Sequence, residues 1–329
     1  MHGSMAYLAD EIETRTNPGR IFDGTRAFIV VADQYARRGE PEKHAPGEGR
    51  IARYARGRDY HAVMKRRLHA LADALRERYA GADFRSCVDT APVPERELAA
   101  LAGLGWVGKN TMVIHPRIGS WFVLGVMATN LELEATSAGG RVADHCGTCT
   151  RCIEACPTGA ITPYRVDASR CVSYLTIEHR GEIPAAMHAG IGTWVYGCDV
   201  CQEVCPHNSA RAEVGATPHA AYAPIRTGFN LFDIMGWDEP SRREAFARSA
   251  MKRVTLAMMK RNAMIAAGNL ARSGTLSESE RTAVWARVRA IAGDAHEDAL
   301  VRATARAVVM GAALPGSDNA ARAGYDGTG

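Results

Sequence analysis

Eight of the nine cysteines in this 329-residue chain lie in two short runs whose spacing suits a metal centre. The first run is Cys146-x2-Cys149-x2-Cys152-x3-Cys156-Pro157. The second is Cys198-x2-Cys201-x3-Cys205-Pro206, with Cys171 upstream. A turn with thiolates at such spacing can wrap a [4Fe–4S] cluster, and its backbone amides can hydrogen-bond the sulfur atoms.

A triple of cysteines followed by Cys-Pro is the run of bacterial two-cluster ferredoxins, in which the fourth cysteine ligates the other cluster. If this exchange holds, one cluster takes Cys146, Cys149, Cys152 and Cys205, and the other takes Cys156, Cys171, Cys198 and Cys201. Structural zinc is the alternative, but zinc sites use two pairs of ligands rather than a triple. The ninth cysteine, Cys87, is expected to be a buried free thiol.

The composition predicts a soluble, cytoplasmic protein with no membrane span. Hydrophobic residues make up 47% and charged residues 23%, which is ordinary for a globular chain of two or three domains. The longest apolar stretch, residues 121–128, is far shorter than the roughly 20 residues that cross a bilayer, and the start lacks the apolar region of a signal peptide. Nothing reads as an interface stripe, so we expect a monomer.

The elements that must position the cysteines alternate before them and are helical after them. We expect strands at residues 26–32, 111–115 and 121–129, and helices at 60–79 and 95–102, which predicts an α/β domain. Beyond Phe232 we expect helices at 242–268, 281–291 and 300–310, with a break at Ser273-Gly274 and a capping signal at Thr275-Leu-Ser-Glu278.

The predicted fold class is therefore α+β with several domains. We assign residues 1–135 to the α/β domain, 136–230 to a ferredoxin-like domain with two clusters, and 231–329 to a helical, solenoid-like domain. Two clusters alone transfer electrons and bind no substrate. The added domains suggest that electrons pass to a second cofactor or to a substrate.

Several segments outside the cysteine runs resemble epoxyqueuosine reductase, the QueG family. They are Arg53-Tyr-Ala-Arg-Gly-Arg-Asp-Tyr-His61, Asp89-Thr-Ala-Pro-Val-Pro-Glu-Arg-Glu97, Gly103-Leu-Gly-Trp-Val-Gly-Lys-Asn110, Gly119-Ser-Trp-Phe122, Cys171-Val-Ser-Tyr-Leu-Thr-Ile-Glu178 and Gly197-Cys-Asp-Val-Cys-Gln-Glu-Val-Cys-Pro206. The resemblance covers nearly the whole chain. It differs at the start, because Gly3-Ser-Met-Ala-Tyr-Leu8 is normally preceded by a strand and a helix, so we expect a short cofactor domain.

The resemblance implies an enzyme that reduces epoxyqueuosine to queuosine at the wobble position of tRNA, the last step of queuosine synthesis. It implies a base-off cobalamin in the N-terminal domain, fed by two [4Fe–4S] clusters and a low-potential electron donor, and a HEAT-like C-terminal domain. By the same resemblance the tRNA partners carry a GUN anticodon.

Asp89 matches the family's proposed proton donor, and a general acid needs a pKa raised by a partly buried site. The alternative role for Asp89 is an N-cap of the following helix. The resemblance places six residues in contact with cobalamin: Arg53, Asp89, Lys109, Asn110, Ser173 and Asp199. A surface or turn role is open for each of them. His61 and His69 are expected to be ordinary surface or half-buried histidines.

Two groups of basic residues fit an RNA partner. The first contains Arg50, Arg53, Arg56, Arg58, Lys65, Arg66 and Arg67, and the second contains Arg242, Arg243, Arg248, Lys252, Arg253, Lys260 and Arg261. Such groups can contact phosphates, or can be solvated helix faces. Two other functions compete: a cobalamin enzyme like the reductive dehalogenases, which are usually exported, and a ferredoxin-like electron carrier without catalysis.

Overall fold

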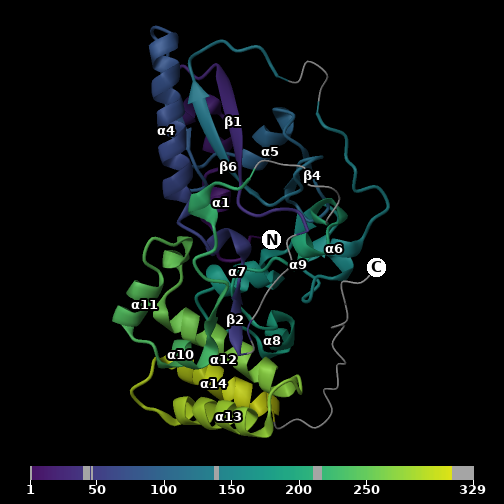
Figure 1. Cartoon of the computed structure of the whole chain (residues 1–329), viewed down its shortest axis with the longest axis vertical. Coiled ribbons are helices and arrows are strands. Elements are labelled where there is room, and N and C mark those ends of the chain that lie inside the picture. The colour runs from purple at the N-terminus through teal and green to yellow at the C-terminus, as the bar shows by residue number, and fades with distance from the viewer. Residues whose placement is uncertain (1, 40–44, 46, 137–140, 210–216, 313–329) are drawn as a thin grey trace.

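The computed structural model describes residues 2–39, 45, 47–136, 141–209 and 217–312. A sheet with its helices occupies one end of the molecule and the C-terminal helices occupy the other (Figure 1). The cysteine-bearing segments lie between these ends, to one side (Figure 1). The tail from Gly316, which the sequence suggests is frayed, lies outside the described residues, as does part of the polar stretch before the first cysteine run.

The N-terminal sheet has the order β1-β6-β3 and is antiparallel. Its strands are β1 (Ala27–Gln34), β6 (Phe122–Thr129) and β3 (Phe84–Cys87). The predicted strands at 26–32 and 121–129 are confirmed. β1 is half-buried rather than buried, because it lies at the edge of the described sheet.

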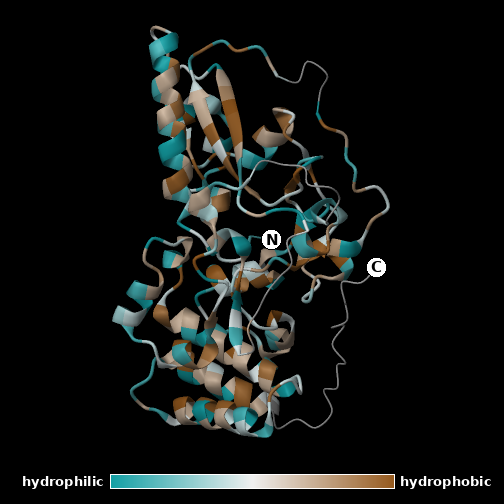
Figure 2. Cartoon of the chain, in the orientation of Figure 1, coloured by the Kyte–Doolittle hydropathy of each residue, from teal (hydrophilic) through white to brown (hydrophobic). Residues whose placement is uncertain are grey.

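Two helices cover the two faces of this sheet. Helix α4 (Tyr60–Arg78) packs Met64 and Leu68 against Met127 of β6, while α5 (Glu95–Leu101) lies on the other face, toward Val126. Both faces of β6 are therefore buried, which explains its continuous run of apolar residues (Figure 2). The predicted strand at 111–115 is a short hairpin partner, β5 (Val113–Ile114), of β4 (Trp106–Val107).

Short elements carry the cysteines. These are α6 (Arg151–Glu154), β7 (Ile161–Thr162), β8 (Arg165–Val166), α7 (Val172–Ile177), α8 (Ala185–Ile191), β9 (Trp194–Tyr196) and α9 (Val200–Glu203). Three short helices precede β1: α1 (Tyr7–Asp10), α2 (Ile12–Thr16) and α3 (Pro18–Ile21). Just before α1, the Ser4 backbone N–H donates to the Tyr174 hydroxyl of α7 at 2.8 Å.

A second sheet joins segments far apart in the sequence. Strand β2 (Glu48–Ile51) pairs in parallel with β9 and antiparallel with β10 (Gly228–Asn230). Strand β2 was not predicted, because it is four residues long and half polar. A side chain at Gly49 would place its Cβ 2.4 Å from a Val195 methyl, so only glycine allows this close packing.

The C-terminal part is helical, as predicted, but its first long helix is interrupted. The helices are α10 (Leu231–Gly236), α11 (Glu239–Ala245), α12 (Leu256–Arg272), α13 (Glu278–Gly293) and α14 (Ala299–Ala312). The predicted helix at 242–268 is wrong because Arg248 adopts a left-handed conformation (φ 58°) and Thr255 caps a new helix by accepting from the Met258 N–H. The capping box is also displaced, since it uses Ser277 and Glu280.

Helix α12 fastens the helical part to the cysteine-bearing part. The buried Asn262 donates to the Thr176 and Val195 carbonyls, both at 2.9 Å, and the buried Arg261 guanidinium donates to three more carbonyls of 175–181. The bonds to the Leu175 and Thr176 carbonyls satisfy groups at the C-terminal end of α7, which the helix itself leaves unpaired. No helix among the described residues is long and apolar enough to cross a membrane.

We expect Asn262→Ala to lower the free energy of unfolding by about 2–4 kcal/mol, because it leaves two buried carbonyls without donors. Urea unfolding of the reconstituted protein measures this loss. Arg289→Ala, on the exposed face of α13, is the control and should change stability by no more than about 0.5 kcal/mol. Equal effects of the two substitutions would contradict this role of α12.

Candidate cluster sites and active site

The cysteine sulfurs lie in two groups of four. Cys205 lies within electrostatic reach of Cys146, Cys149 and Cys152. In the other group, Cys201 interacts with Cys198 and Cys171, and more weakly with Cys152 of the first group, while Cys171 interacts with Cys156. These interactions agree with the two sets of the ferredoxin-like exchange, which stay a prediction. All nine cysteines are free thiols, and Cys87 is buried apart from these groups, in the core of the N-terminal sheet.

Burial disfavours the ionised form of these thiols. It raises the pKa of Cys205 to about 11 and raises the pKa of Cys198 and Cys201 further. Ionised sulfur in such a place needs nearby positive charge, which iron supplies. No group of three or more His, Cys, Asp or Glu residues in the described ranges converges on a single metal ion, whereas four zinc thiolates lie about 3.8 Å apart. Eight thiols in these two runs are the donor set that two [4Fe–4S] clusters require.

The segment 103–110 holds the cysteine loops in place. The Lys109 ammonium donates to the Gly147 carbonyl at 2.6 Å and to the Cys149 carbonyl at 3.0 Å. The buried Asn110 amide donates to the Cys201 carbonyl at 3.3 Å. The side chains of Lys109 and Asn110, which the resemblance places in contact with cobalamin, therefore hydrogen-bond the backbone of the two cysteine runs.

Arg53 and Asp199 form a link between β2 and α9. The Asp199 carboxylate accepts the Arg53 backbone N–H at 2.6 Å, and the Arg53 guanidinium stacks over the Trp121 ring at 4.8 Å. Burial raises the pKa of Asp199 to about 6. Ser173 lies on α7, two residues after Cys171, and its carbonyl accepts from the Thr176 hydroxyl.

Asp89 lies apart from this link, in the loop between β3 and α5. Its backbone is left-handed (φ 50°) and its side chain is 64% exposed. The His61 ring donates to its carboxylate at 3.1 Å, and this bond is the main reason that the pKa of Asp89 lies below its usual value. The predicted raised pKa is therefore wrong for this arrangement, and Asp89 is ionised at neutral pH.

His61 holds the proton instead. Its Nδ1 bonds the Asp59 carboxylate at 2.7 Å, while its ring stacks on Tyr60 with centroids 3.9 Å apart. Burial favours the neutral ring, but the bonds to Asp59 and Asp89 outweigh it and raise the pKa of His61 to about 9. His61 is half-buried, as expected, but its two carboxylate partners and its raised pKa were not predicted. His69 is exposed, as expected.

The sequence contained a signal for this arrangement. Asp59 is the N-cap of α4 and accepts the His61 backbone N–H, so an Asp-x-His sequence at a helix start places the ring beside the carboxylate. The contact between His61 and Asp89 joins residues 28 positions apart, and no local pattern predicts it.

Glu95, in the first turn of α5, is a second acid beside Asp89. Burial raises its pKa to about 7, and the charge of Asp89 adds to the effect. Its Oε1 atom is buried without a hydrogen-bond donor in the described part of the chain. A ligand with amide groups could supply that donor.

Most residues of the two predicted basic groups have partners inside the fold. Arg50 pairs with Glu203, Arg67 with Asp33, Arg242 with Glu239, Arg253 with Glu178 and Lys260 with Glu297, while Arg56 and Arg261 are buried. The exposed residues Arg58, Arg248 and Lys252 lie around Asp59, because the Asp59 N–H donates to the Arg248 carbonyl at 2.8 Å and Lys252 interacts with the Asp59 charge. A basic rim therefore borders the Asp59–His61–Asp89 site.

Comparison with known proteins agrees with these observations. Residues 145–208 match a family described as a 4Fe-4S double cluster binding domain, and residues 15–90 match one described as "Epoxyqueuosine reductase QueG, DUF1730". An epoxyqueuosine reductase of Leadbetterella byssophila is 40% identical over 264 residues, which cover 79% of this chain and 83% of that protein. One of Alicycliphilus denitrificans is 38% identical, covering 92% of this chain and 84% of that protein.

Solved structures of epoxyqueuosine reductases are also similar to this chain. An epoxyqueuosine reductase with an epoxyqueuosine-modified tRNA-Tyr stem loop has a TM-score of 0.78 and 28% identity, covering 90% of this chain and 76% of that one. A Bacillus subtilis structure, in which the loop with the catalytic aspartate is swung out of the active site, has a TM-score of 0.77 and 27% identity, covering 89% of this chain and 75% of that one.

The fold and the cysteine groups thus define an iron–sulfur protein with a two-cluster segment inserted between a mixed α/β part and a helical part. The chain belongs to the epoxyqueuosine reductase family, the QueG family.

We expect the His61 ring to titrate near pH 9, and Asp59→Asn to move its pKa back toward the ordinary 6.5, because one of its two carboxylate partners is lost. NMR of histidine labelled with ¹³C measures both values, with the exposed His69 as reference. Because the folded pKa is raised, the stabilisation from His61 is complete below about pH 6.5 and disappears as the pH rises through 9. A His61 titration that is the same in both proteins would contradict the assignment.

The grouping of the cysteines predicts which substitutions act on the same cluster. Cys146→Ser and Cys205→Ser should alter one electron paramagnetic resonance (EPR) signal of the reduced protein, and Cys171→Ser should alter the other. Cys87→Ser is the control and should leave both signals unchanged. If Cys205→Ser altered the signal that Cys171→Ser alters, the division into two sets would be wrong.

Proposed function

We propose that this protein reduces epoxyqueuosine to queuosine at the wobble position of tRNA, the last step of queuosine synthesis. Membership of the epoxyqueuosine reductase family supports this function, as does the likeness to a structure that contains an epoxyqueuosine-modified tRNA stem loop. The observation that carries the proposal for this chain is the Asp59–His61–Asp89 site, which holds a proton on His61 beside the exposed carboxylate of Asp89.

The reaction converts an epoxide into an alkene and water, so it consumes two electrons and two protons. The clusters would be filled by a low-potential donor and pass electrons one at a time. Base-off cobalamin, held against this chain, would supply the two-electron chemistry that the reduction of the epoxide needs. The protein must then place a proton at the oxygen that leaves.

The proposed proton path uses the hydrogen bond between His61 and Asp89. At neutral pH the two side chains share one proton, and it resides on His61. Transfer from Nε2 to the carboxylate, over 3.1 Å, would let Asp89 present the proton to the oxygen of the substrate. Asp59 would hold the ring in the required orientation through its bond to Nδ1. In a Bacillus subtilis relative the loop with the catalytic aspartate is swung out of the active site. In this chain the bond between His61 and Asp89 would oppose such a movement of the Asp89 loop.

We place cobalamin against the part of the chain formed by residues 1–135. The unsatisfied Oε1 of Glu95 beside Asp89 supports this position, because the corrin ring carries amide side chains that could donate to it. Asp89, Arg53 and Ser173 would face the cofactor. Lys109, Asn110 and Asp199 would act on it through the cysteine loops and the Arg53 turn that they hold.

The basic rim of Arg58, Arg248 and Lys252 would contact phosphates on either side of the modified nucleotide. Such contacts position the RNA without reading its sequence, so recognition of a GUN anticodon would depend on the pocket that receives the base. The domain limits at residues 135 and 230, the HEAT-like description of the helices and the monomeric state are part of the same proposal.

An electron carrier without catalysis would have no use for the Asp89 site. A dehalogenase-like enzyme would not need the basic rim.

We expect Asp89→Asn to retain both clusters and bound cobalamin but to lower the rate of queuosine formation at least 100-fold, because an amide cannot deliver the proton. Mass spectrometry of nucleosides from treated tRNA measures the rate. Asp83→Asn is the matched control. The Asp83 side chain is 61% exposed and lies just before β3, the strand that Asp89 follows, so this variant should retain the wild-type rate. Unchanged turnover in Asp89→Asn would remove Asp89 from the mechanism.

A further inference from the structure

The indole N–H of Trp106 is a buried donor without an ordinary acceptor. Trp106 is the first residue of β4 and is 4% exposed. Its Nε1 atom is buried and has no hydrogen-bond partner among the described residues. Buried tryptophan N–H groups nearly always have a partner, so this atom requires an explanation.

The surroundings of Trp106 are those of one cysteine group. Trp106 packs with Ile114, Cys146 and Cys205, and the ring edges of His145 and His207 meet it at centroid distances of 5.0 and 4.8 Å. The Trp106 side chain lies close enough to Cys146 to act on the charge of its sulfur, although no hydrogen bond of ordinary geometry joins them in the described part of the chain. A thiol is a weak acceptor, whereas a thiolate bound to iron carries negative charge and accepts more strongly.

The backbone fixes the position of this ring. Trp106 pairs with Ile114 across the β4–β5 hairpin. The preceding residue must be glycine, because a Cβ at Gly105 would lie 2.2 Å from the Ile114 carbonyl oxygen. Three residues further on, Lys109 fastens the same segment to the Cys149 carbonyl. Contacts before and after Trp106 in the sequence therefore hold the indole next to the cysteine loop.

We infer that Trp106 donates a hydrogen bond to the Cys146 thiolate of the cluster held by Cys146, Cys149, Cys152 and Cys205, and thereby raises the reduction potential of that cluster alone. The added electron of a reduced cluster increases the charge on its sulfur atoms, so a donor to that sulfur stabilises the reduced form. The inference rests on the proposed clusters. It adds that the two clusters differ in potential because of one named side chain.

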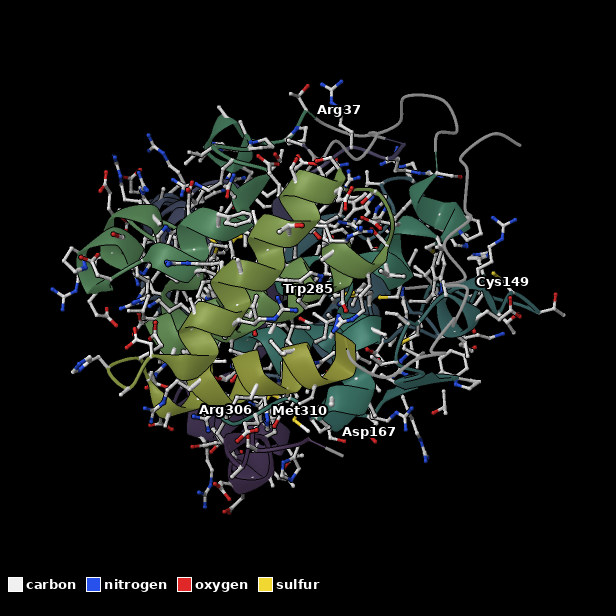
Figure 3. All side chains as sticks on the ribbon, turned by 90° about the horizontal axis from the view of Figure 1, so that it is seen from below. Arg37, Cys149, Asp167, Trp285, Arg306 and Met310 are labelled. Carbon is white, nitrogen blue, oxygen red and sulfur yellow. The ribbon has the colours of Figure 1, made fainter. Side chains whose placement is uncertain are left out.

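The test is Trp106→Phe, which keeps an aromatic ring in the same packing and removes the N–H. Redox titration followed by EPR should show one cluster moving to a more negative midpoint potential while the other stays fixed. Iron content should stay at the wild-type level. Trp285→Phe is the control, because Trp285 lies on α13, well away from Cys149 (Figure 3), and it should move neither potential.

A second measurement does not depend on a variant. In the wild-type protein, exchange into D2O should shift an iron–thiolate stretching band in the resonance Raman spectrum, and Trp106→Phe should reduce that shift. Unchanged potentials in Trp106→Phe, or equal movement of both, would overturn the inference while leaving the clusters intact. So would a wild-type spectrum insensitive to exchange. A wild-type chain that binds no clusters would overturn the proposed function as well.

Discussion

Two groups of sulfur atoms removed from water are the constraint on which the rest of this structure depends. Burial disfavours the ionised thiols, and bound iron would supply the positive charge that stabilises them. Cluster binding and folding of the middle of the chain are therefore one equilibrium. Hydrogen bonds stabilise the loops that carry these sulfurs. Lys109 and Asn110 donate to cysteine carbonyls, and Asn262 donates to the Thr176 carbonyl of α7.

One continuous segment connects the clusters to the acid. Strand β2 lies beside β9, the Arg53 N–H meets Asp199 between two cysteines, and the chain then enters α4 at the Asp59 cap. His61 and, through it, Asp89 are thus positioned by the same turn that abuts the cluster segment. Electrons and the proton would reach one place because a short stretch of backbone, residues 48–61, fixes both routes.

The sequence predicted what local spacing encodes. The cysteine runs, α4 and the two long strands of the first sheet follow from periodicity and motif, and the structure has them. Strand β2 was missed because its pairing partners lie about 145 and 180 residues away, so tertiary contact rather than propensity forms it. The sequence predicted one helix over residues 242–268, but the left-handed backbone of Arg248 interrupts it.

The candidate site was predictable in part, for the same reason. Asp89 was identified by resemblance, but its ionisation depends on a histidine from another element, and that contact has no sequence signal. The basic residues were visible as groups, yet several of them pair with acids distant in the sequence, as Arg50 does with Glu203 and Lys260 with Glu297. Trp106 stood within a recognisable block, but only its buried and unsatisfied N–H gives it a role.

The most direct test of the central claim is to reconstitute the wild-type chain anaerobically with iron, sulfide and cobalamin and to incubate it with tRNA that carries epoxyqueuosine under a strong reductant. The account predicts that queuosine forms, and that it forms only when both the clusters and cobalamin are present. A chain with full cluster content and bound cobalamin that leaves epoxyqueuosine unchanged would contradict it.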